Sequence, residues 1–550
     1  MLLPSGVQMS VTDRSGSRAK AQVARAAGLV MALFVVSRAL GLAREMVISH
    51  QFGTSGELDA YLAAFRLPDI LFQLVAGGAL ASAFIPTFAS YLVRHNENRG
   101  WRLASAIVNL VLLLTTALAI LAALLAPWLV QAIIAPGFDP ERQALTVNLM
   151  RTMLLTPIVF GVSGVFMGVL NARQHFLLPA LAPIMYNLGI MAGALFLAPT
   201  VGVRGLAWGV VAGALGHLLV QVPGVLRQGF VYTPTLGLRD RGVHEVVRLM
   251  LPRVAGLAAV QVNFLVNTIL ASGLAPGSLS AVNYAWLLML LPQGVFAQAV
   301  ATAAFPTFSS QAARGERTEM RSTLSATLRA VLYMALPAAV GLIVLRTPLV
   351  QMIFERGAFT DASTHMVAWA LALFALGLPA HSVVEIVVRA FYALHDTKTP
   401  VAVGILAMGL NVALSLLLID AFGRLGWLPL GGLALSNSLA TTAEMTILLL
   451  ILRRRLGGLE GRRLASSMLR LGVAAAVMGT AVGWLLHLLA AAPPWLSSSL
   501  GILVGLTIYG GLSLAFRAPE PQAVWGLIRQ RRALPGGGSD TAADDQSASA

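Results

Sequence analysis

Apolar residues along this chain gather in long runs, and shorter polar segments separate them. A helix rises about 1.5 Å per residue, so roughly 20 apolar residues cross the ~30 Å hydrocarbon core of a bilayer. The runs therefore predict membrane-spanning helices. We expect fourteen spans, at residues 23–49, 59–91, 104–133, 144–170, 178–198, 202–226, 246–272, 278–308, 324–354, 363–393, 400–420, 427–452, 466–489 and 496–516.

The composition supports an all-α integral membrane protein. The 550 residues are 57% hydrophobic and only 11% charged, with a mean hydropathy of +0.78, whereas about a quarter of a soluble protein is charged. The absence of cysteine excludes disulfide bonds and thiolate metal sites. Basic cytoplasmic loops explain the net charge of +15, and the bases are not clustered as a nucleic-acid-binding face requires. We therefore expect the bilayer, and no nucleic acid, as a partner.

The basic residues of the loops predict the orientation of the chain. Loops on the side of the N-terminal tail hold most of them, including the run Arg453–Arg455. The other side holds little beyond Arg142, Arg204, Arg346, Arg356 and Arg424. Because basic loops stay in the cytoplasm, we expect both termini there and an even number of spans.

A weak internal repeat, with an offset of about 220 residues, predicts two related halves. AFIPTFAS around Pro86 returns as AFPTFSS around Pro306, and PWLVQAI from Pro127 returns as PLVQMI from Pro348. Six spans per half would give both halves the same orientation, with a site at their interface, as in many transporters. The predicted units are a cytoplasmic tail (1–22), an N-lobe (23–226), a cytoplasmic linker (227–245), a C-lobe (246–452), a last helix pair (466–516) and a cytoplasmic tail with a disordered end (517–550).

Charged side chains inside predicted spans are candidate site residues, because a charge at mid-bilayer costs about 2.5–3.5 kcal/mol on insertion scales. The first span carries Arg38, Arg44 and Glu45. The second span carries a polar stripe at helical spacing, formed by Asp59, Arg66, Asp69 and Gln73. Inward arginines favour an anionic substrate, since guanidinium binds phosphate and carboxylate with two hydrogen bonds. Facing both arginines of the first span into one cavity requires a kink near Gly41.

Several of these charges also have simpler interpretations. Asp59 either faces the cavity or is solvated at the outer interface, and Arg253 either faces the cavity or extends to the headgroups. Glu385 and Arg389, four residues apart in the tenth span, are more simply a structural or gating pair than a substrate site.

Missing motifs narrow the function further. Neither Lys20 nor Lys398 lies in a GxxxxGK[ST] motif, so a P-loop ATPase is excluded. There is no HExxH motif, no GxSxG motif and no cluster of metal ligands. We expect no cofactor or metal, and transport driven by the membrane potential or by a coupled cation that the sequence does not identify.

Five segments together resemble the MurJ/MviN lipid II flippases of the multidrug/oligosaccharidyl-lipid/polysaccharide exporter superfamily. They are SRALGLARE (37–45), FGTSGELDAYLAAFRLP (52–68), GGALASAFIPTF (77–88), NARQHFLLPALAP (171–183) and RAFYALHDTKTP (389–400). The resemblance implies fourteen helices in two six-helix lobes, and a final pair whose groove holds the lipid tail. It also implies alternating access that carries lipid II, the undecaprenyl-pyrophosphate-linked disaccharide-pentapeptide, across the bacterial inner membrane for peptidoglycan synthesis. The family's first-helix arginines match Arg38 and Arg44, and its acidic residue at the start of the second helix matches Asp59.

The chain departs from the family pattern in two spans. It reads PDILFQ (68–73) and AGG (76–78) where relatives read PNLLRR and AEG, and YAWL (284–287) where relatives read YADR. The second-helix arginine and glutamate of the family's cavity are therefore missing, and so is the cavity arginine of the eighth span. We hypothesise that Arg66 and Arg253 compensate in part.

These observations predict a monomeric lipid II flippase, a transporter and not an enzyme, with Arg38, Arg44, Asp59, Arg66 and Arg253 around the substrate. The alternatives are an exporter of another polyprenyl-linked glycan and, with less support, a membrane-embedded transferase acting on such lipids.

Overall fold

The computed structural model describes residues 11–75, 78–93 and 97–516, and within these ranges the chain forms helices and no strands. The predicted all-α membrane architecture is confirmed. The first helices are α1 (Val11–Phe52), α2 (Gly56–Val75), α3 (Gly78–Val93), α4 (Glu97–Leu129), the π-helix η1 (Val130–Ile134), α5 (Pro140–Met153), α6 (Leu155–Ala172), α7 (Leu177–Ala192), the π-helix η2 (Gly193–Leu197), α8 (Ala198–Val201), α9 (Val203–Leu219) and α10 (Val222–Arg227). The remaining helices are α11 (Arg241–Ser272), α12 (Ser278–Ala313), α13 (Arg317–Val344), α14 (Arg346–Phe354), α15 (Asp361–Ala393), α16 (Lys398–Arg424), α17 (Leu430–Arg455), α18 (Gly461–Leu488) and α19 (Pro494–Ala515).

By length and composition, eleven helical stretches of the described residues are able to cross a membrane. The three other predicted spans fall on α1, on α11 and on the pair α2 and α3. The second predicted span covers α2 and α3, and residues 76–77 between them lie outside the described ranges. Pro68 and Pro292 both lie within their helices, α2 and α12.

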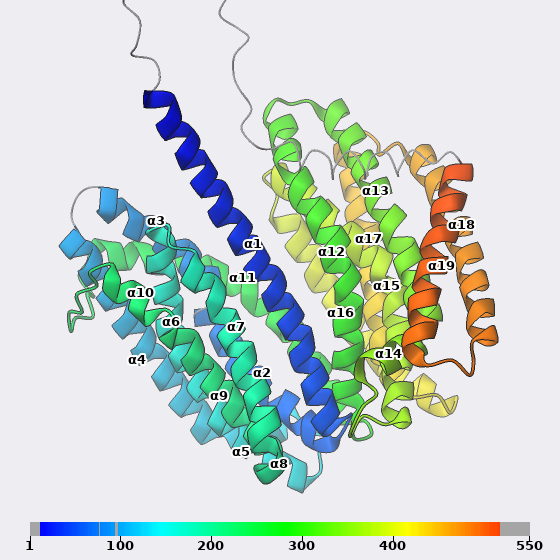
Figure 1. Ribbon diagram of the computed structural model, residues 1–550, viewed down its shortest axis with the longest axis horizontal. Helices are drawn as coiled ribbons and strands as arrows, with labels where there is room; N and C mark the ends of the chain where they lie inside the picture. Colours follow the sequence, from blue (N-terminus) through cyan, green and yellow to red (C-terminus); the bar gives the residue numbers. More distant parts are fainter. Residues whose placement is uncertain (1–10, 76–77, 94–96, 517–550) are drawn as a thin grey trace, which may run out of the picture.

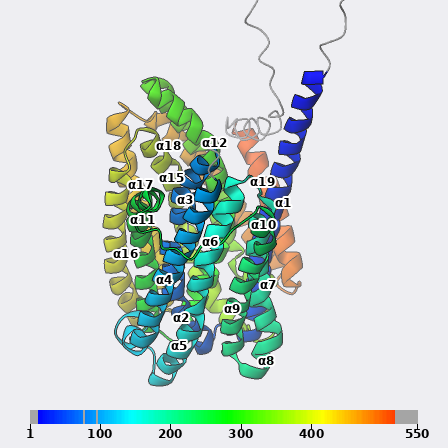
Figure 2. The same ribbon diagram turned by 90° about the vertical axis from the view of Figure 1, so that its left-hand side faces the viewer.

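The helices form two groups, which we call the N-lobe (α1–α10) and the C-lobe (α12–α17), with α18 and α19 on the outer flank of the C-lobe (Figure 1). Helix α1 runs between the two groups, and its N-terminal end rises above the other N-lobe helices to about the level that α12 reaches (Figures 1 and 2). Helix α11 joins the lobes, because Val243 and Val246 near its start pack in one core cluster with Phe88 and Trp101 of the N-lobe.

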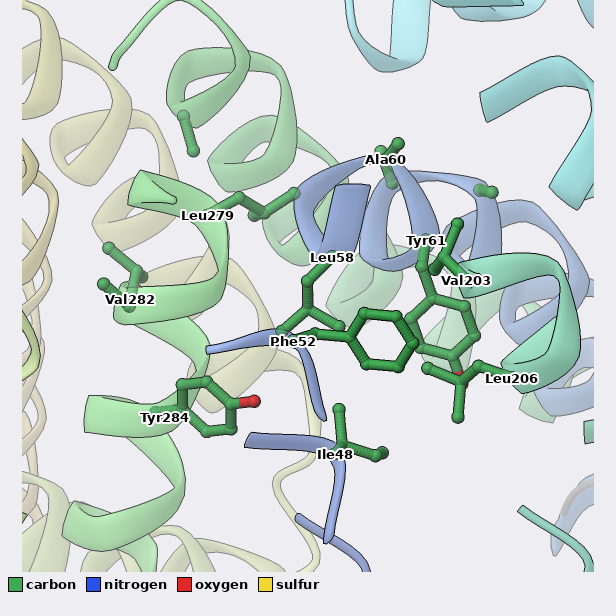
Figure 3. Close-up of a cluster of buried hydrophobic side chains, with 14 of the residues drawn as sticks. Ile48, Phe52, Leu58, Ala60, Tyr61, Val203, Leu206, Leu279, Val282 and Tyr284 are labelled. Atoms are coloured by element: carbon green, nitrogen blue, oxygen red, sulfur yellow. The ribbon is translucent and has the colours of Figure 1, made fainter. Parts of the chain in front are cut away.

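The largest hydrophobic cluster belongs to both lobes. Ile48 of α1 and Leu58 of α2 pack in it together with Leu206 of α9 and Leu279 of α12 (Figure 3). These residues lie near the turn that joins α1 to α2, so the lobes are held together at this end of the molecule.

Glycines allow the N-lobe helices α7 and α9 to pack closely. A Cβ atom at Gly189 of α7 would lie 2.2 Å from the Cα of Gly213, and one at Gly193, the first residue of η2, would lie 2.5 Å from the Cα of Gly209. Small residues at a helix–helix contact let the backbones approach where lipid supplies no hydrophobic driving force.

Backbone geometry repeats between the two halves. Gln174 (φ 59°) and His395 (φ 58°) are two of the three non-glycine residues with positive φ in the described ranges. They occupy matching places in NARQHFLLP (171–179) and YALHDTKTP (392–400), two segments separated by the same offset of about 220 residues as the internal repeat. An L-residue rarely adopts this conformation, so the shared strain supports the internal duplication.

Candidate functional site

A cavity of about 250 Å³ lies where the two lobes meet. Residues of α1, α2, α7 and α12 line it. Its volume is below the roughly 300–1,000 Å³ of pockets that enclose drug-sized ligands. In this conformation it therefore has room for only the innermost part of a large ligand.

Arg44 lines the cavity from α1 and is held in place by two neighbours. Its Nη2 lies 2.5 Å from Glu45 Oε1, and its Nη1 donates a hydrogen bond of 3.1 Å to Asn187 Oδ1 on α7. The side chains of Arg44 and Glu45 are both partly exposed. A phosphate entering the cavity therefore meets an oriented guanidinium, although a carboxylate already neutralises it.

Arg66 lines the same cavity from α2 and bridges to the C-lobe side. Its Nε donates to Thr268 Oγ1 at 2.8 Å, and its Nη2 donates to Asn283 Oδ1 at 3.4 Å. Asp69, one turn further along α2, also lines the cavity. The predicted polar stripe of the second span therefore supplies a second cation and a second carboxylate to one site.

The lining from the C-lobe is uncharged. It consists of Ser280, Asn283, Tyr284, Trp286, Leu287 and Leu290, all from α12. The segment YAWL, which departs from the family pattern, supplies three of these residues. The cavity is therefore charged on its N-lobe side and aromatic and aliphatic on the other.

Asp59 does not line this cavity; it joins the lobes beside it. It is only 1% exposed, and both of its oxygens accept from backbone N–H groups at the start of α12. Gly277 N–H donates to Oδ2 at 2.7 Å and Ser280 N–H donates to Oδ1 at 2.8 Å. The first N–H groups of a helix have no partner within it and carry positive partial charge, so a carboxylate there is stabilising. Neither sequence interpretation of Asp59 describes this capping role.

Further contacts between the lobes surround Asp59, and we call residues 50–59, 137, 272–280 and 357–363 the inter-lobe seal. Thr54 Oγ1 donates to Ser363 Oγ at 2.7 Å, and Ala358 N–H donates to the carbonyl of His50 at 2.8 Å. On the other side, Gly137 N–H donates to Ser272 Oγ at 3.1 Å. The N-lobe and the C-lobe are therefore closed onto each other at this end.

The seal is reciprocal, as the internal repeat requires. A loop of the N-lobe places Gly137 against Gly273, just after α11, where a Cβ atom would lie 2.5 Å from the Gly273 Cα. The equivalent loop of the C-lobe lies 220 residues later and contains Ala358. It packs on Gly53, just after α1: a Cβ atom at Gly53 would lie 2.3 Å from the Ala358 carbonyl oxygen. The N-lobe loop thus packs on the turn between α11 and α12, and the C-lobe loop packs on the turn between α1 and α2. Glycine is needed at both contacts for the close approach.

An apolar groove of about 510 Å³ runs between α12, α13, α18 and α19. Pro337, Gly341, Met478 and Gly505 are among its lining residues. It lies where the resemblance predicts a groove for a lipid tail, made in part by the final helix pair. Its walls suit a hydrocarbon chain.

The other predicted site residues lie elsewhere. Arg38 is exposed on α1, with its guanidinium 5.3 Å from the centre of the Phe34 ring, and is not a lining residue. The helix continues through Gly41 without interruption, and of Arg38 and Arg44 only Arg44 lines the cavity. Arg253 lies on α11, but its side chain is outside the described residues.

Glu385 and Arg389 pair with each other on α15, as the spacing predicts. Arg389 Nη1 lies 2.5 Å from Glu385 Oε2 and also donates to the Glu385 carbonyl at 2.8 Å. Neither side chain lines the cavity. The geometry is that of a self-neutralising structural pair.

In the part of the chain that the structure describes, no three His, Cys, Asp or Glu side chains gather as metal ligands do. Asn263 of α11 accepts a hydrogen bond of 3.3 Å from Asn411 Nδ2 of α16, so it contributes to a contact between helices.

Sequence reasoning missed the lining residues that carry no charge. Tyr61, Tyr186 and Trp286 line the cavity, and Asn187 orients Arg44. An aromatic or amide residue in an apolar helix gives no signal of its own, because packing uses the same residue types. Trp286 and Leu287 had a local signal, through their departure from the family pattern.

Comparison with known proteins shows similarity along most of the chain. The family model described as "Lipid II flippase MurJ" matches residues 48–504. The lipid II flippase MurJ of Burkholderia cenocepacia is 32% identical over 442 residues, which cover 78% of this chain and 84% of that protein. The probable lipid II flippase MurJ of Haemophilus influenzae is 30% identical, over 82% of this chain and 90% of that protein.

Solved structures show the same similarity in the fold. A lipid II flippase MurJ in an inward closed conformation superposes with a TM-score of 0.73 at 25% identity, covering 89% of this chain and 99% of that one. An inward-facing multidrug transporter of the MATE family matches with a TM-score of 0.62 at 16% identity, over 77% of this chain and 96% of that one. The second match shows a shared fold only.

Proposed function

The chain belongs to the lipid II flippase MurJ family, and on this premise we propose that it carries lipid II from the inner to the outer leaflet of the bacterial inner membrane, for cell wall synthesis. The observation that carries the proposal is the cavity at the lobe interface, with Arg44 and Arg66 on its N-lobe side. Two guanidinium groups on one wall of a cavity whose opposite wall carries no charge suit a pyrophosphate attached to a lipid.

Alternating access follows from the position of the seal. The capped helix α12 and the paired loops close one end of the molecule next to the cavity, so the head group enters from the other end. Opening the seal and closing the other end would expose the cavity to the opposite side. During this cycle the groove between α12, α13, α18 and α19 would hold the undecaprenyl chain, because its walls are apolar.

The phosphates would compete with groups that already hold the arginines. Arg44 is paired with Glu45, and Arg66 donates to Thr268 and Asn283. A pyrophosphate offers two hydrogen bonds per guanidinium in fixed geometry. Binding would therefore exchange partners at Arg44 and Arg66 and leave Glu45 uncompensated, which weakens retention of the phosphates and favours release.

Orientation and energy complete the proposal. With the basic loops in the cytoplasm, both termini lie inside and the seal faces the periplasm. The chain acts as a monomer, and transport is driven by the membrane potential or by a coupled cation. Moving one elementary charge across 100 mV supplies about 2.3 kcal/mol, so a pyrophosphate moving outward gains from a potential that is negative inside.

One observation favours a second candidate cargo. Trp286 and Leu287 occupy the cavity wall where relatives have an acid and an arginine. Fewer cations around the phosphates would suit another polyprenyl-linked glycan with a smaller or differently charged head group.

The test is depletion of the native gene followed by measurement of lipid II at the outer leaflet. Wild type should restore export, and Arg44→Ala and Arg66→Ala should not. Arg424→Ala is the matched control, because Arg424 is exposed and pairs with Asp420 on its own helix. Unchanged lipid II export after depletion would refute the proposed cargo. Normal export in both cavity variants would refute the role of the cavity.

A further inference from the structure

The two walls of the cavity differ in charge, so each wall suits a different part of a ligand. Arg44, Glu45, Arg66 and Asp69 of the N-lobe carry all the charges among the lining residues. The C-lobe wall, all from α12, has no charged residue: Tyr284, Trp286 and two leucines line it together with the polar Ser280 and Asn283. Phosphates therefore belong against the N-lobe wall. The aromatic and aliphatic part of the C-lobe wall therefore suits an uncharged group that presents C–H bonds.

Trp286 is the largest side chain of the C-lobe wall, and its orientation is fixed from behind. The Phe374 ring meets it at 5.3 Å and 65°, and the His381 ring meets it at 5.5 Å and 76°. His381 is held in turn by Asn437, with 3.0 Å between His381 Nε2 and Asn437 Oδ1. Both ring contacts are edge-to-face, so neither ring is stacked parallel on the indole. The indole is therefore preorganised and still lines the cavity.

We propose that Trp286 is a specificity-determining residue that stacks on the sugar ring attached to the pyrophosphate of the polyprenyl cargo. One face of a pyranose is lined with C–H bonds whose hydrogens carry partial positive charge, and the face of an indole carries partial negative charge. Arg66 fixes the position of the phosphate relative to Trp286, because its guanidinium donates a hydrogen bond across the cavity to Asn283, one turn from Trp286 on α12. A phosphate held by Arg66 would therefore place the first sugar beside the indole.

The inference rests on the proposed function but makes a separate claim. In the segment YAWL (284–287), where relatives have an acid and an arginine, recognition of the saccharide replaces electrostatic attraction. Trp286 should therefore discriminate between lipids with and without a sugar, whereas the arginines act on both. A tryptophan that only fills space would make no such distinction.

The experiment compares two probes on the purified full-length protein: undecaprenyl pyrophosphate, which has no sugar, and lipid II. Trp286→Leu keeps an apolar side chain but removes the aromatic face. We expect it to weaken lipid II binding roughly 3- to 10-fold and to leave undecaprenyl pyrophosphate unchanged. Trp286→Phe should recover most of the loss. Trp484→Leu is the matched control, because Trp484 is 68% exposed on α18, away from the cavity, and it should change neither affinity.

The result that overturns the inference is an unchanged ratio of the two affinities in Trp286→Leu, whether both fall together or neither falls. The proposed function has a different readout, namely flipping of lipid II by wild type in vesicles. If wild type does not flip lipid II but Trp286→Leu weakens lipid II binding selectively, the protein recognises the sugar and carries another glycan. Flipping with an unchanged ratio would leave a flippase in which Trp286 only packs.

Discussion

The bond between Asp59 and the start of α12 gives the sharpest prediction about the inter-lobe seal. Asp59→Ala removes the acceptor of two N–H groups, those of Gly277 and Ser280. Both hydrogen bonds lie between the lobes and are buried. The substitution should therefore raise the population in which the seal is open.

The magnitude follows from the two orphaned donors. A buried donor left without its partner costs about 1–3 kcal/mol, and more where the lost partner was charged. Opening lets water reach both N–H groups, so we take the lower half of the range, about 2–4 kcal/mol for the pair. At 1.4 kcal/mol per factor of ten, this raises the open population roughly 30- to 700-fold. Asp59→Asn keeps one acceptor and should give an intermediate effect.

The chain contains no cysteine, so a single introduced thiol reports on the seal. Ser363 is 5% exposed and accepts from Thr54 across the lobes. The alkylation rate of Ser363→Cys then measures transient opening, because the closed form protects the thiol. Asp240→Ala is the matched control: Asp240 also caps a helix, α11, but through a hydrogen bond from Gly242 of the same helix.

A clear outcome would refute this reasoning. If Asp59→Ala changes the alkylation rate by less than threefold, and Asp240→Ala gives the same rate, the carboxylate does not hold the lobes together. A rise in both variants would indicate general loosening and would equally contradict a specific role of Asp59.

Three further outcomes test the fold and the groove. Gly189→Ala places a methyl group 2.2 Å from the α9 backbone and should destabilise the protein by about 1–3 kcal/mol in thermal unfolding. Gly409→Ala is the control and should leave the stability unchanged, because no atom lies within 4 Å of the added methyl group. Equal effects of the two substitutions would contradict close packing of α7 on α9. Gly341→Trp fills the apolar groove and should weaken binding of long-chain polyprenyl pyrophosphates relative to short-chain ones, whereas an unchanged ratio argues against a tail site. Hydrogen bonds from the side chain and backbone of Thr399 lower the pKa of Asp396, in the turn after α15, to about 2. The stabilisation by its carboxylate is therefore complete above the unfolded pKa of about 3.9 and disappears as the pH falls through 2. Asp396→Asn should lower the unfolding temperature at pH 7, and a difference that persists at pH 2 would contradict this assignment.

The amino-acid sequence determined the class of this protein because bilayer physics acts on single segments. A helix in lipid satisfies its own hydrogen bonds, so each apolar run predicts a helix without reference to its neighbours. The repeat also followed from local residues, and the matching strained turns at Gln174 and His395 support it. Arg44 and Arg66 could be selected in advance because a charge within an apolar run is expensive wherever the run lies.

Only the tertiary structure decided what each polar group does. Asp59, Arg66 and Asp69 lie on one helix at regular spacing, yet Asp59 caps a helix of the other lobe while the other two face the cavity. Arg38 and Arg44 share α1, and only Arg44 reaches the cavity. The partners of these groups, Gly277, Asn187 and Asn283, lie more than a hundred residues away along the chain. Spacing within a helix fixes its faces, but the neighbour that covers each face depends on how the lobes pack.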